Sequence, residues 1–431
     1  MDIKKKLGIL AGVASVLLLA GCSGATPAAT SSSSSSAADA YSGPLTITWK
    51  NTESAGLNAL LPLYKKLHPG LDVTVSVADS TQLASTTRTQ LSSGTASDIV
   101  WLWAGIGNPL SVGVIGGAGY LADLSKEPWA GTFPGYINPL TQYKGGKTGM
   151  LPMDITSFST FYNDDAMKKA GLKPPTTWDQ VLTFCKAATD KGVSAYAFGP
   201  ATVSDAQNIV YNLAPTLVYG PDPSFTKNLV SGKATFSNTS GWLTTVDKYK
   251  QMLDAGCFPK DLTGLTIPQA TKLVASGGAL GYPTVGFTLS SLQAANPSTS
   301  WTWAPIPATN DAKKQYITAS VTGGPGVSAQ AKNKAAAIAF LNWLAEPAQM
   351  NRYVQALTGT APSIPNKEFV ADSNLTAMNG YIQNKRAVTF LNHYWTNPAL
   401  EQTMQSSLQA MLIGSQSPKQ VLANMTAHIK N

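Results

Sequence analysis

The folded part of the chain opens with strand and helix patterns that alternate. Leu45, Ile47 and Trp49 alternate with polar residues, which is the period of a strand with one buried face. A helical spacing of apolar residues follows, and Pro69-Gly70 ends it. The predicted elements are a strand at 45–49, a helix at 57–67, a strand at 71–77, a helix at 81–91 and a strand at 99–103. This order predicts an α/β fold with a parallel sheet and helices on its faces.

The carboxyl ends of these strands predict where a ligand would bind. In parallel sheets, ligands sit beyond the carboxyl ends of the strands. The segments in that place are Asn51–Glu53 and Trp103–Gly107. We therefore expect Asn51, Glu53, Trp103, Ala104 and Gly105 at one rim.

Apolar stripes predict several further helices later in the chain. Thr177-Trp178-Asp179-Gln180 has the pattern of a capping box and begins one of them. The others are expected around 242–253, 335–345, 399–413 and 418–429. No internal repeat of fixed period is present in the sequence.

The first residues have the pattern of an export signal. Lys4–Lys6 precede an apolar run, Leu7–Ala20, which is shorter than the roughly 20 residues that a membrane-spanning helix needs. The run closes with Leu19-Ala20-Gly21-Cys22, which resembles the lipobox of bacterial lipoproteins. The resemblance implies a signal peptide at 1–21 and lipidation of Cys22. An ordinary secretory signal is the alternative.

A tether rich in serine and alanine follows at 22–43. Such a composition cannot bury enough apolar area to offset the entropy of ordering. A flexible tether of this length spans roughly 25 Å. We therefore expect a folded part held at the cell membrane by lipid alone, facing outside the cytoplasm.

Composition excludes several classes of protein. Apolar residues make up 43% of the chain, which rules out global disorder. Three cysteines cannot form a disulfide scaffold, and three histidines argue against a multi-histidine metal enzyme. The net charge of +8 is scattered without a nucleic-acid-binding motif. We expect no cofactor, no metal and no nucleic-acid partner.

The motifs resemble family 1 extracellular solute-binding proteins, the sugar-receptor subunits of bacterial ABC importers. The most specific stretch pairs Gly146-Lys147, Leu151-Pro152 and Tyr162-Asn163 with a later Pro174-Pro175-Thr176-Thr177-Trp178. Further matching segments are 65–73, 97–100, 121–124 and 323–334.

The resemblance implies a two-lobed, periplasmic-binding-protein-like fold of type II, with lobes joined by crossing hinge strands. Lobe one would hold 44–153 plus 320–358, and lobe two 157–318 plus 362–431. The crossings would fall near Asp154–Thr156, Thr318–Ser320 and Gly359–Ala361. It implies a monomer that captures a carbohydrate, expected to be an oligosaccharide, in the interlobe cleft. The protein would deliver this sugar to ABC transporter permease subunits and perform no covalent chemistry.

Candidate sugar-binding residues combine aromatic rings with polar groups. Sugars stack apolar faces on rings, and their hydroxyls need amides and carboxylates. Core packing is favoured for Trp49, Trp178 and Trp343, while Trp103 is open to either role. A family segment at 277–280 is followed by Tyr282 and Phe287 but by no tryptophan. The full candidate set is Asn51, Glu53, Trp103, Ala104, Gly105, Asp154, Tyr282, Phe287, Trp303, Gly323, Gly324 and Trp395.

Two other functions compete with this hypothesis. A surface glycoside hydrolase would use paired carboxylates from residues such as Glu53, Asp98 and Asp154. A surface adhesin would bind no small ligand. Cys185 is expected to be buried, and its pairing with Cys257 is left open by the sequence.

Overall fold

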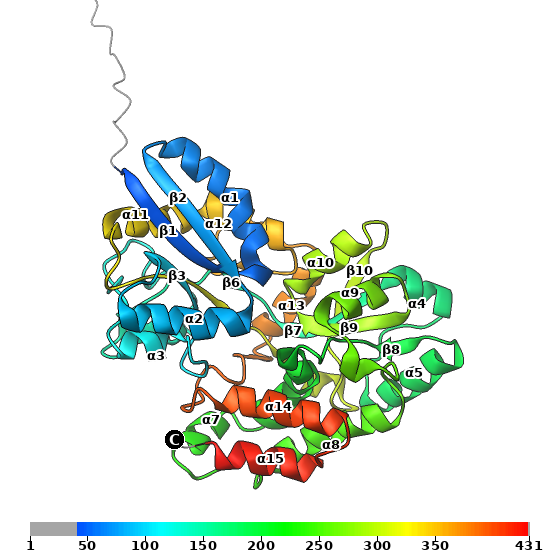
Figure 1. Ribbon diagram of the computed structural model, residues 1–431. Helices are drawn as coiled ribbons and strands as arrows, with labels where there is room; N and C mark the ends of the chain where they lie inside the picture. Colours follow the sequence, from blue (N-terminus) through cyan, green and yellow to red (C-terminus); the bar gives the residue numbers. More distant parts are fainter. Residues whose placement is uncertain (1–40, 430–431) are drawn as a thin grey trace, which may run out of the picture. The chain divides into compact units, whose positions relative to one another are not determined.

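The computed structural model describes residues 41–429 (Figure 1). The predicted signal peptide, Cys22 and almost all of the tether therefore lie outside the described residues. The described residues belong to one compact unit by their internal contacts.

The first sheet has four strands in the order β12-β3-β1-β2. Its strands are β1 (Gly43–Lys50), β2 (Leu71–Ala78), β3 (Ile99–Trp103) and β12 (Gly323–Val327). The predicted parallel arrangement holds for β1, β2 and β3, whereas β12 joins β3 antiparallel. Leu45, Ile47 and Trp49 are buried, as the alternation predicts.

Helices α1 (Ser54–Leu67), α2 (Ser80–Ser93), α3 (Val112–Gly117), α11 (Lys334–Leu344) and α12 (Pro347–Leu357) accompany this sheet. Helices α1 and α12 pack side by side (Figure 1). Tyr64 of α1 meets the ring of Phe340 on α11 at 4.7 Å between centroids. The apolar stripe of α1 thus closes the core on this face of the sheet.

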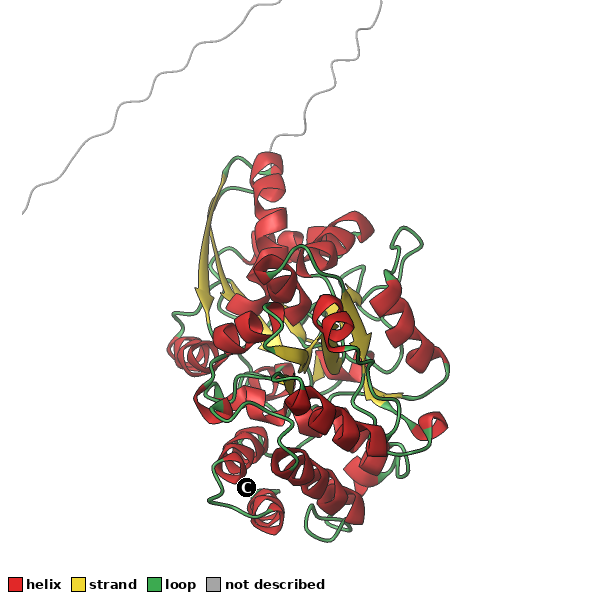
Figure 2. Ribbon diagram, turned by 90° about the vertical axis from the view of Figure 1, so that its right-hand side faces the viewer, coloured by secondary structure: helices red, strands yellow, loops and turns green. Residues whose placement is uncertain are grey.

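The second sheet has the order β10-β7-β9-β8. Its strands are β7 (Phe158–Asn163), β8 (Ser194–Tyr196), β9 (Ala279–Val285) and β10 (Trp301–Ala304). Strand β7 is antiparallel to both neighbours, and β8 runs parallel to β9. In Figure 2 these strands, in yellow, lie between helices, in red.

The remaining helices lie in the chain between the strands of the second sheet or after the last of them. They are α4 (Asp164–Ala170), α5 (Trp178–Asp190), α6 (Asn208–Ala214), α7 (Phe225–Val230), α8 (Ser240–Asp254), α9 (Ile267–Ala275), α10 (Thr288–Ala295), α13 (Ser373–Gln383), α14 (Leu400–Leu412) and α15 (Pro418–Ala427). The predicted helices near 242, 335, 399 and 418 are confirmed by α8, α11, α14 and α15.

The predicted capping box at the start of α5 is only half formed. Thr177 Oγ1 accepts a hydrogen bond from Gln180 N at 3.4 Å, as expected of an N-cap. Gln180 Oε1 instead accepts from the backbone N–H of Thr176 at 2.8 Å. The Thr176 hydroxyl also donates to Gln180 Oε1, at 2.9 Å, so the Gln180 side chain binds the residue before the N-cap and not the N-cap itself.

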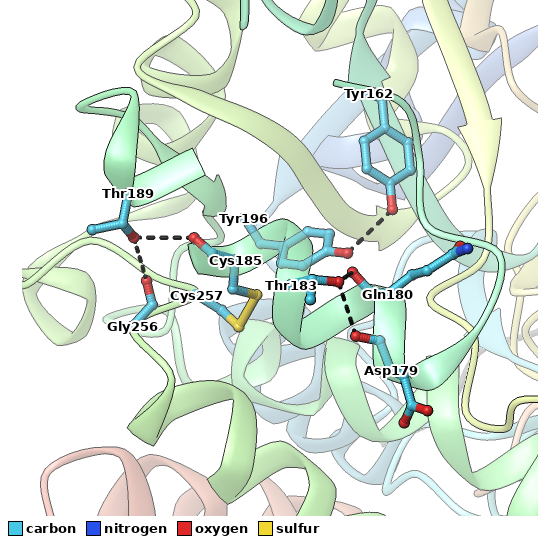
Figure 3. Close-up of a disulfide and its surroundings, with 9 residues drawn as sticks. All are labelled: Tyr162, Asp179, Gln180, Thr183, Cys185, Thr189, Tyr196, Gly256 and Cys257. Carbon is cyan, nitrogen blue, oxygen red and sulfur yellow. Dashed lines mark hydrogen bonds between the residues drawn. A yellow bond between two sulfur atoms is a disulfide. The ribbon is translucent and has the colours of Figure 1, made fainter. Parts of the chain in front are cut away.

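A disulfide joins Cys185 on α5 to Cys257 just after α8, across 72 residues of sequence (Figure 3). The backbone carbonyl of Cys257 accepts from Tyr196 N, which ties the bridge to β8. Both cysteines are fully buried. The structure thus answers the pairing that the sequence left open.

Short strand pairs link the two sheets. Strand β6 (Asp154–Ile155) pairs with β13 (Ala361–Pro362), and Thr156 bridges Ser320. Thr156 Oγ1 also donates to Gly359 O at 3.3 Å. The three segments predicted to cross therefore lie side by side, while the division of the chain into lobes stays a prediction. The other short pairs are β4 (Gln142–Tyr143) with β5 (Lys147–Thr148) and β11 (Ile317–Thr318) with β14 (Ala387–Val388).

Candidate functional site

Polar residues gather at the carboxyl edge of the first sheet. Lys50 ends β1, Glu53 closes the 3-10 turn that follows, and Trp103 ends β3. Asp154 of β6 and Thr322, just before β12, reach the same place. The topology of parallel strands brings these segments together, because their carboxyl ends share one edge.

Four of these side chains, together with Tyr353 of α12, form what we name the lysine cluster: Lys50, Glu53, Asp154, Thr322 and Tyr353. Lys50 Nζ lies 3.0 Å from Glu53 Oε1. Thr322 Oγ1 lies 3.1 Å from Asp154 Oδ1 and 3.4 Å from Glu53 Oε1. The Tyr353 hydroxyl donates to Glu53 Oε2 at 3.5 Å. Glu53 and Asp154 are both 0% exposed, so the cluster is sealed from solvent.

Burial sets the electrostatics of the two carboxyl groups. It raises the pKa of Glu53, against the opposing effect of the Lys50 ammonium and three hydrogen bonds. Burial also raises the pKa of Asp154 well above its ordinary value, and there the Glu53 charge adds to the effect. The two carboxyls are therefore unequal, since Glu53 holds the cation and Asp154 does not.

Two aromatic rings flank the Lys50 ammonium. Its Nζ lies 4.9 Å from the ring centroid of Phe287 and 5.6 Å from that of Trp103. Phe287 follows β9 of the second sheet, so the cation touches residues from both sheets. Trp103 is partly exposed, whereas Trp49 and Trp101 on the same sheet are fully buried. Trp103 is thus the one of these three tryptophan rings that is partly open to solvent.

A second group, which we name the glutamate cluster, comprises Asn108, Gln207, Asn392 and Glu401. The amides of the first three donate to the Glu401 carboxylate. Other bonds fix their orientation, because Tyr211 OH donates to Asn392 Oδ1 and Gln405 Nε2 to Gln207 Oε1, both at 3.0 Å. Burial raises the pKa of Glu401, while these hydrogen bonds and the Lys50 charge oppose the shift. The Lys50 charge thus acts on both clusters.

Backbone contacts close the space between the loop after β3 and the segment after β14. Ile106 N donates to His393 O at 2.8 Å. A Cβ on Gly105 would fall on His393 O, and one on Gly107 on Asn392 O. Gly105 also has a φ of +72°, where glycine is favoured. Glycine at these positions lets the two backbones touch.

The structure places the other predicted site residues in different surroundings. Asn51 is exposed beside Glu53, and Ala104 is buried with its N–H on Thr322 O. Gly323 and Gly324 lie inside β12, paired with β3. Tyr282 and Trp303 are buried in strands of the second sheet, and Trp395 is buried in the segment before α14.

These three aromatic residues have structural partners away from both clusters. Tyr282 OH donates to the buried Asp205 at 2.8 Å, and Trp303 Nε1 donates to Ser157 Oγ at 3.2 Å. Trp395 is 1% exposed and packs on Phe236, with 5.5 Å between centroids. A ring that is fully enclosed by side chains offers no face for stacking.

Sequence reasoning missed Lys50, Thr322 and the whole glutamate cluster. Lys50 stands directly before the predicted Asn51, so the strand-end argument extended by one residue would have found it. Glu401 lies in the first turn of the helix predicted at 399–413 and Asn392 lies before it, and no local signal marked either as a site residue.

The carboxylates do not have the arrangement of a glycosidase. Glu53 and Asp154 are sealed, and Asp98 accepts from Thr46 N and Asn333 N inside the first sheet. None of the three named candidates is open to a glycosidic bond. The hydrolase hypothesis therefore finds no support in this geometry.

Within residues 41–429, no group of three or more His, Cys, Asp or Glu side chains is placed to hold a metal ion. Over the same part of the chain, no helix combines the length and hydrophobicity that crossing a membrane requires.

Comparison with known proteins decides the family. The sequence pattern of the family described as bacterial extracellular solute-binding protein matches residues 48–351, more than half of the chain. The chain belongs to this family.

Solved structures show the fold of this solute-binding protein. A family 1 extracellular solute-binding protein from Bifidobacterium longum subsp. infantis is 23% identical, with 90% of this chain and 98% of that chain covered and a TM-score of 0.65. RafE, a solute-binding protein in complex with raffinose, is 19% identical over 90% and 99%, with a TM-score of 0.74. A sugar transporter protein from Bacillus licheniformis in complex with stachyose is 19% identical over 89% and 98%, with a TM-score of 0.72. The predicted two-lobed fold of type II is confirmed.

Proposed function

We propose that this solute-binding protein captures a neutral oligosaccharide between its lobes and delivers it to the permease of an ABC importer. Family membership supports a binding role, and structures of the same fold hold raffinose and stachyose. The observation that carries the proposal is the partly exposed Trp103 beside Lys50, whose charge also acts on the glutamate cluster.

This arrangement matches what a sugar needs. The face of an indole ring accepts the C–H face of a pyranose, and the amides of Asn108, Gln207 and Asn392 can exchange partners with hydroxyls. Glu401 supplies a charged acceptor, and hydrogen bonds to charged groups are the stronger ones. Phe287 supplies a second ring from the opposite sheet.

The two-lobed fold allows the hinge motion that would enclose the sugar. Proteins of this architecture close by a hinge around their ligand. The three crossing segments that lie side by side, near Thr156, Ser320 and Gly359, are the hinge we propose. The closed form would then be the one that the permease recognises.

Attachment to the cell surface is part of the same proposal. Cys22 would carry the lipid, and the serine-rich tether would let the folded part reach a permease in the same membrane. A Cys22→Ala variant should lose its acyl mass and leave the membrane fraction or stay unprocessed. Membrane retention of the wild type without an acyl group would contradict the anchor.

A thermal-shift screen over a glycan panel tests the binding function. A ligand that binds only the folded state stabilises it by about 2.7 kcal/mol at a hundredfold excess over its dissociation constant. Raffinose, stachyose and chitin oligosaccharides are the first probes, with amino acids, peptides and metal ions as the comparison set. A shift with a peptide, amino acid or metal and with no carbohydrate would overturn the proposal.

A further inference from the structure

The lysine cluster holds two carboxyl groups on a single hydroxyl. Thr322 Oγ1 lies within hydrogen-bond distance of both Asp154 Oδ1 and Glu53 Oε1. A threonine hydroxyl has one proton, so it can donate to only one of them. Asp154 Oδ2 is buried and makes no hydrogen bond with any residue of the described chain.

The charges of the lysine cluster do not balance when both of its carboxyl groups are ionised. Within residues 41–429, the ion pair that involves either carboxyl group is the one between Lys50 and Glu53. With both carboxyls ionised, a net negative charge would be sealed beside an unpartnered oxygen. Burying such a charge is costly, and groups in this position take up a proton instead.

One extra proton makes the cluster neutral and gives every donor in it an acceptor. If Asp154 Oδ1 carries it, Asp154 donates to Thr322, and the Thr322 hydroxyl is free to donate to Glu53. Glu53 then accepts from Thr322, Lys50 and Tyr353, and the cluster is neutral. The unpartnered Asp154 Oδ2 becomes the carbonyl oxygen of an acid, which is less costly to bury than a carboxylate oxygen.

We propose that Asp154 is a neutral carboxylic acid in the folded protein and that, through Thr322 and Glu53, it positions the Lys50 ammonium between Trp103 and Phe287. The part that concerns ligand binding rests on the proposed function. Asp154 lies in β6, one of the segments that we propose as the hinge, so this proton lies within that hinge.

The protonation states of the titratable groups around Asp154 agree with a neutral Asp154. Burial raises the pKa of Asp154 well above its ordinary value, and the Glu53 charge adds to it. Burial also raises the pKa of Tyr353 of α12, which keeps it a neutral donor. His393 lies 3.3 Å from Ser320 Oγ by its Nδ1, and burial lowers its pKa to about 3, so it stays uncharged. Glu401 is linked to the cluster through the Lys50 charge alone.

The protonation state has a direct test that needs no ligand. In protein with ¹³C-labelled aspartate carboxyl groups, one resonance should keep the shift of a protonated acid at pH 7 and be absent from Asp154→Asn. If that variant does not fold, Thr322→Val removes the relay hydroxyl and should move the same resonance. Ionised shifts for all aspartates at pH 7 would overturn the proposal.

The pH dependence of unfolding gives a second, independent measurement. Because the folded state keeps a proton that the unfolded state releases above about pH 3.9, stability should fall as pH rises. The unfolding constant of the wild type should therefore rise by about tenfold per pH unit relative to Asp154→Asn, until Asp154 ionises in the folded state. Parallel pH profiles for the two proteins would contradict the assignment.

Asp98→Asn is the matched control, because its expected effect on the pH dependence of stability has the opposite sign. Asp98 is a buried aspartate at the opposite end of β3, and hydrogen bonds from Asn333 and Thr46 outweigh burial and lower its pKa. Its carboxylate stabilises the fold above the unfolded pKa, and this contribution is lost as pH falls. Asp98→Asn should therefore be less stable than the wild type at pH 7, with the difference shrinking toward acid.

The positioning role is tested by the Lys50 side chain itself. With ¹³C-labelled lysine, the Lys50 methylene next to the ammonium should show a ring-current shift from Trp103 and Phe287. The shift should persist in Asp154→Asn, which keeps a donor to Thr322, and be lost in Asp154→Ala. Lys248, 3.7 Å from the Trp178 ring centroid, is the internal reference that neither variant should move. An unchanged Lys50 shift in Asp154→Ala would refute positioning, whatever the sugar screen shows.

Discussion

A tryptophan at a strand end has a different role from one inside the strand. Trp101 and Trp103 point to the same side of β3, yet Trp101 is fully buried and Trp103 is partly exposed beside Lys50. The difference arises because the sheet ends at Trp103, so no further strand residues cover its ring. Position along the strand, not residue type, leaves the Trp103 ring partly exposed.

Trp103→Ala should weaken oligosaccharide binding by about 1–3 kcal/mol, the scale of one buried aromatic contact. The fold should stay intact, because a partly exposed ring at a strand end carries little of the core. Isothermal titration with the best sugar from the screen measures the loss, and circular dichroism checks the fold.

Trp103→Phe is the matched control, since it keeps an aromatic face and should retain most of the affinity. Equal affinity in the wild type and Trp103→Ala would leave the binding function standing and remove Trp103 from the site.

Residue-level prediction from the sequence worked where local pattern and topology coincide. The strand-end rule predicted that Glu53 and Trp103 share one rim, and both lie at the carboxyl edge of the first sheet. It could not find Glu401 or Asn392, because their position depends on how the last third of the chain folds back. It also could not separate Tyr282, which is a buried partner of Asp205, from Phe287, which meets Lys50.

At the scale of elements, the apolar pattern predicted the early elements because most have one buried face and β3 is almost wholly buried. Thus β1 and α1 follow their apolar stripes closely. The antiparallel β12 was beyond this reasoning, since Gly323–Val327 consists of glycine, proline and one valine. Its place beside β3 is fixed by backbone pairing between segments far apart in sequence.

The contact between the loop after β3 and the segment after β14 depends on glycine. Gly107→Ala would place a Cβ on the carbonyl oxygen of Asn392, so the two segments must separate. We expect a cost of about 1–3 kcal/mol in stability, the usual range for an overpacked contact. Sugar affinity should also fall, because Asn392 belongs to the glutamate cluster.

Gly117→Ala in α3 is the control, because a Cβ there meets nothing within 4 Å. It should be neutral or stabilise the helix slightly, since glycine is a poorer helix former than alanine. Thermal unfolding and titration with the same sugar compare the two variants. Equal behaviour of Gly107→Ala and Gly117→Ala would show that the contact does not constrain the molecule.

The disulfide should matter for stability and not for binding. It closes a loop of 72 residues, and the chain-entropy account assigns about 4 kcal/mol to a loop of that size. The double variant Cys185→Ala/Cys257→Ala should lose stability on that scale in denaturant unfolding. Neither α5 nor the end of α8 contributes a residue to the two clusters, so sugar affinity should be unchanged. A large loss of affinity with little loss of stability would contradict this separation.

At the scale of the whole molecule, we expect ligand binding to shift the population between open and closed arrangements of the lobes. The lysine cluster draws its members from β1, β6 and α12, and its cation reaches Phe287 of the second sheet. A ligand that adds contacts to both sheets favours the arrangement in which they are close. In the proposed function, the energy for closure would come from differential contacts to Trp103 and to the glutamate cluster.

Charge distribution predicts how the whole molecule responds to acid. The chain has 23 acidic residues among 431, so protonating them adds little positive charge for its size. Burial raises the pKa of Glu53, Asp154, Asp205 and Glu401, so these groups oppose folding less as pH falls. Asp98, whose pKa is lowered, acts in the other direction, and its contribution is lost only near its unfolded pKa of about 3.9. We therefore expect the fold to persist to about pH 4, near the model carboxyl pKa values, when it is followed by circular dichroism on heating. Loss of structure already at about pH 5, above those values, would show that the paired carboxylates outweigh the buried acids.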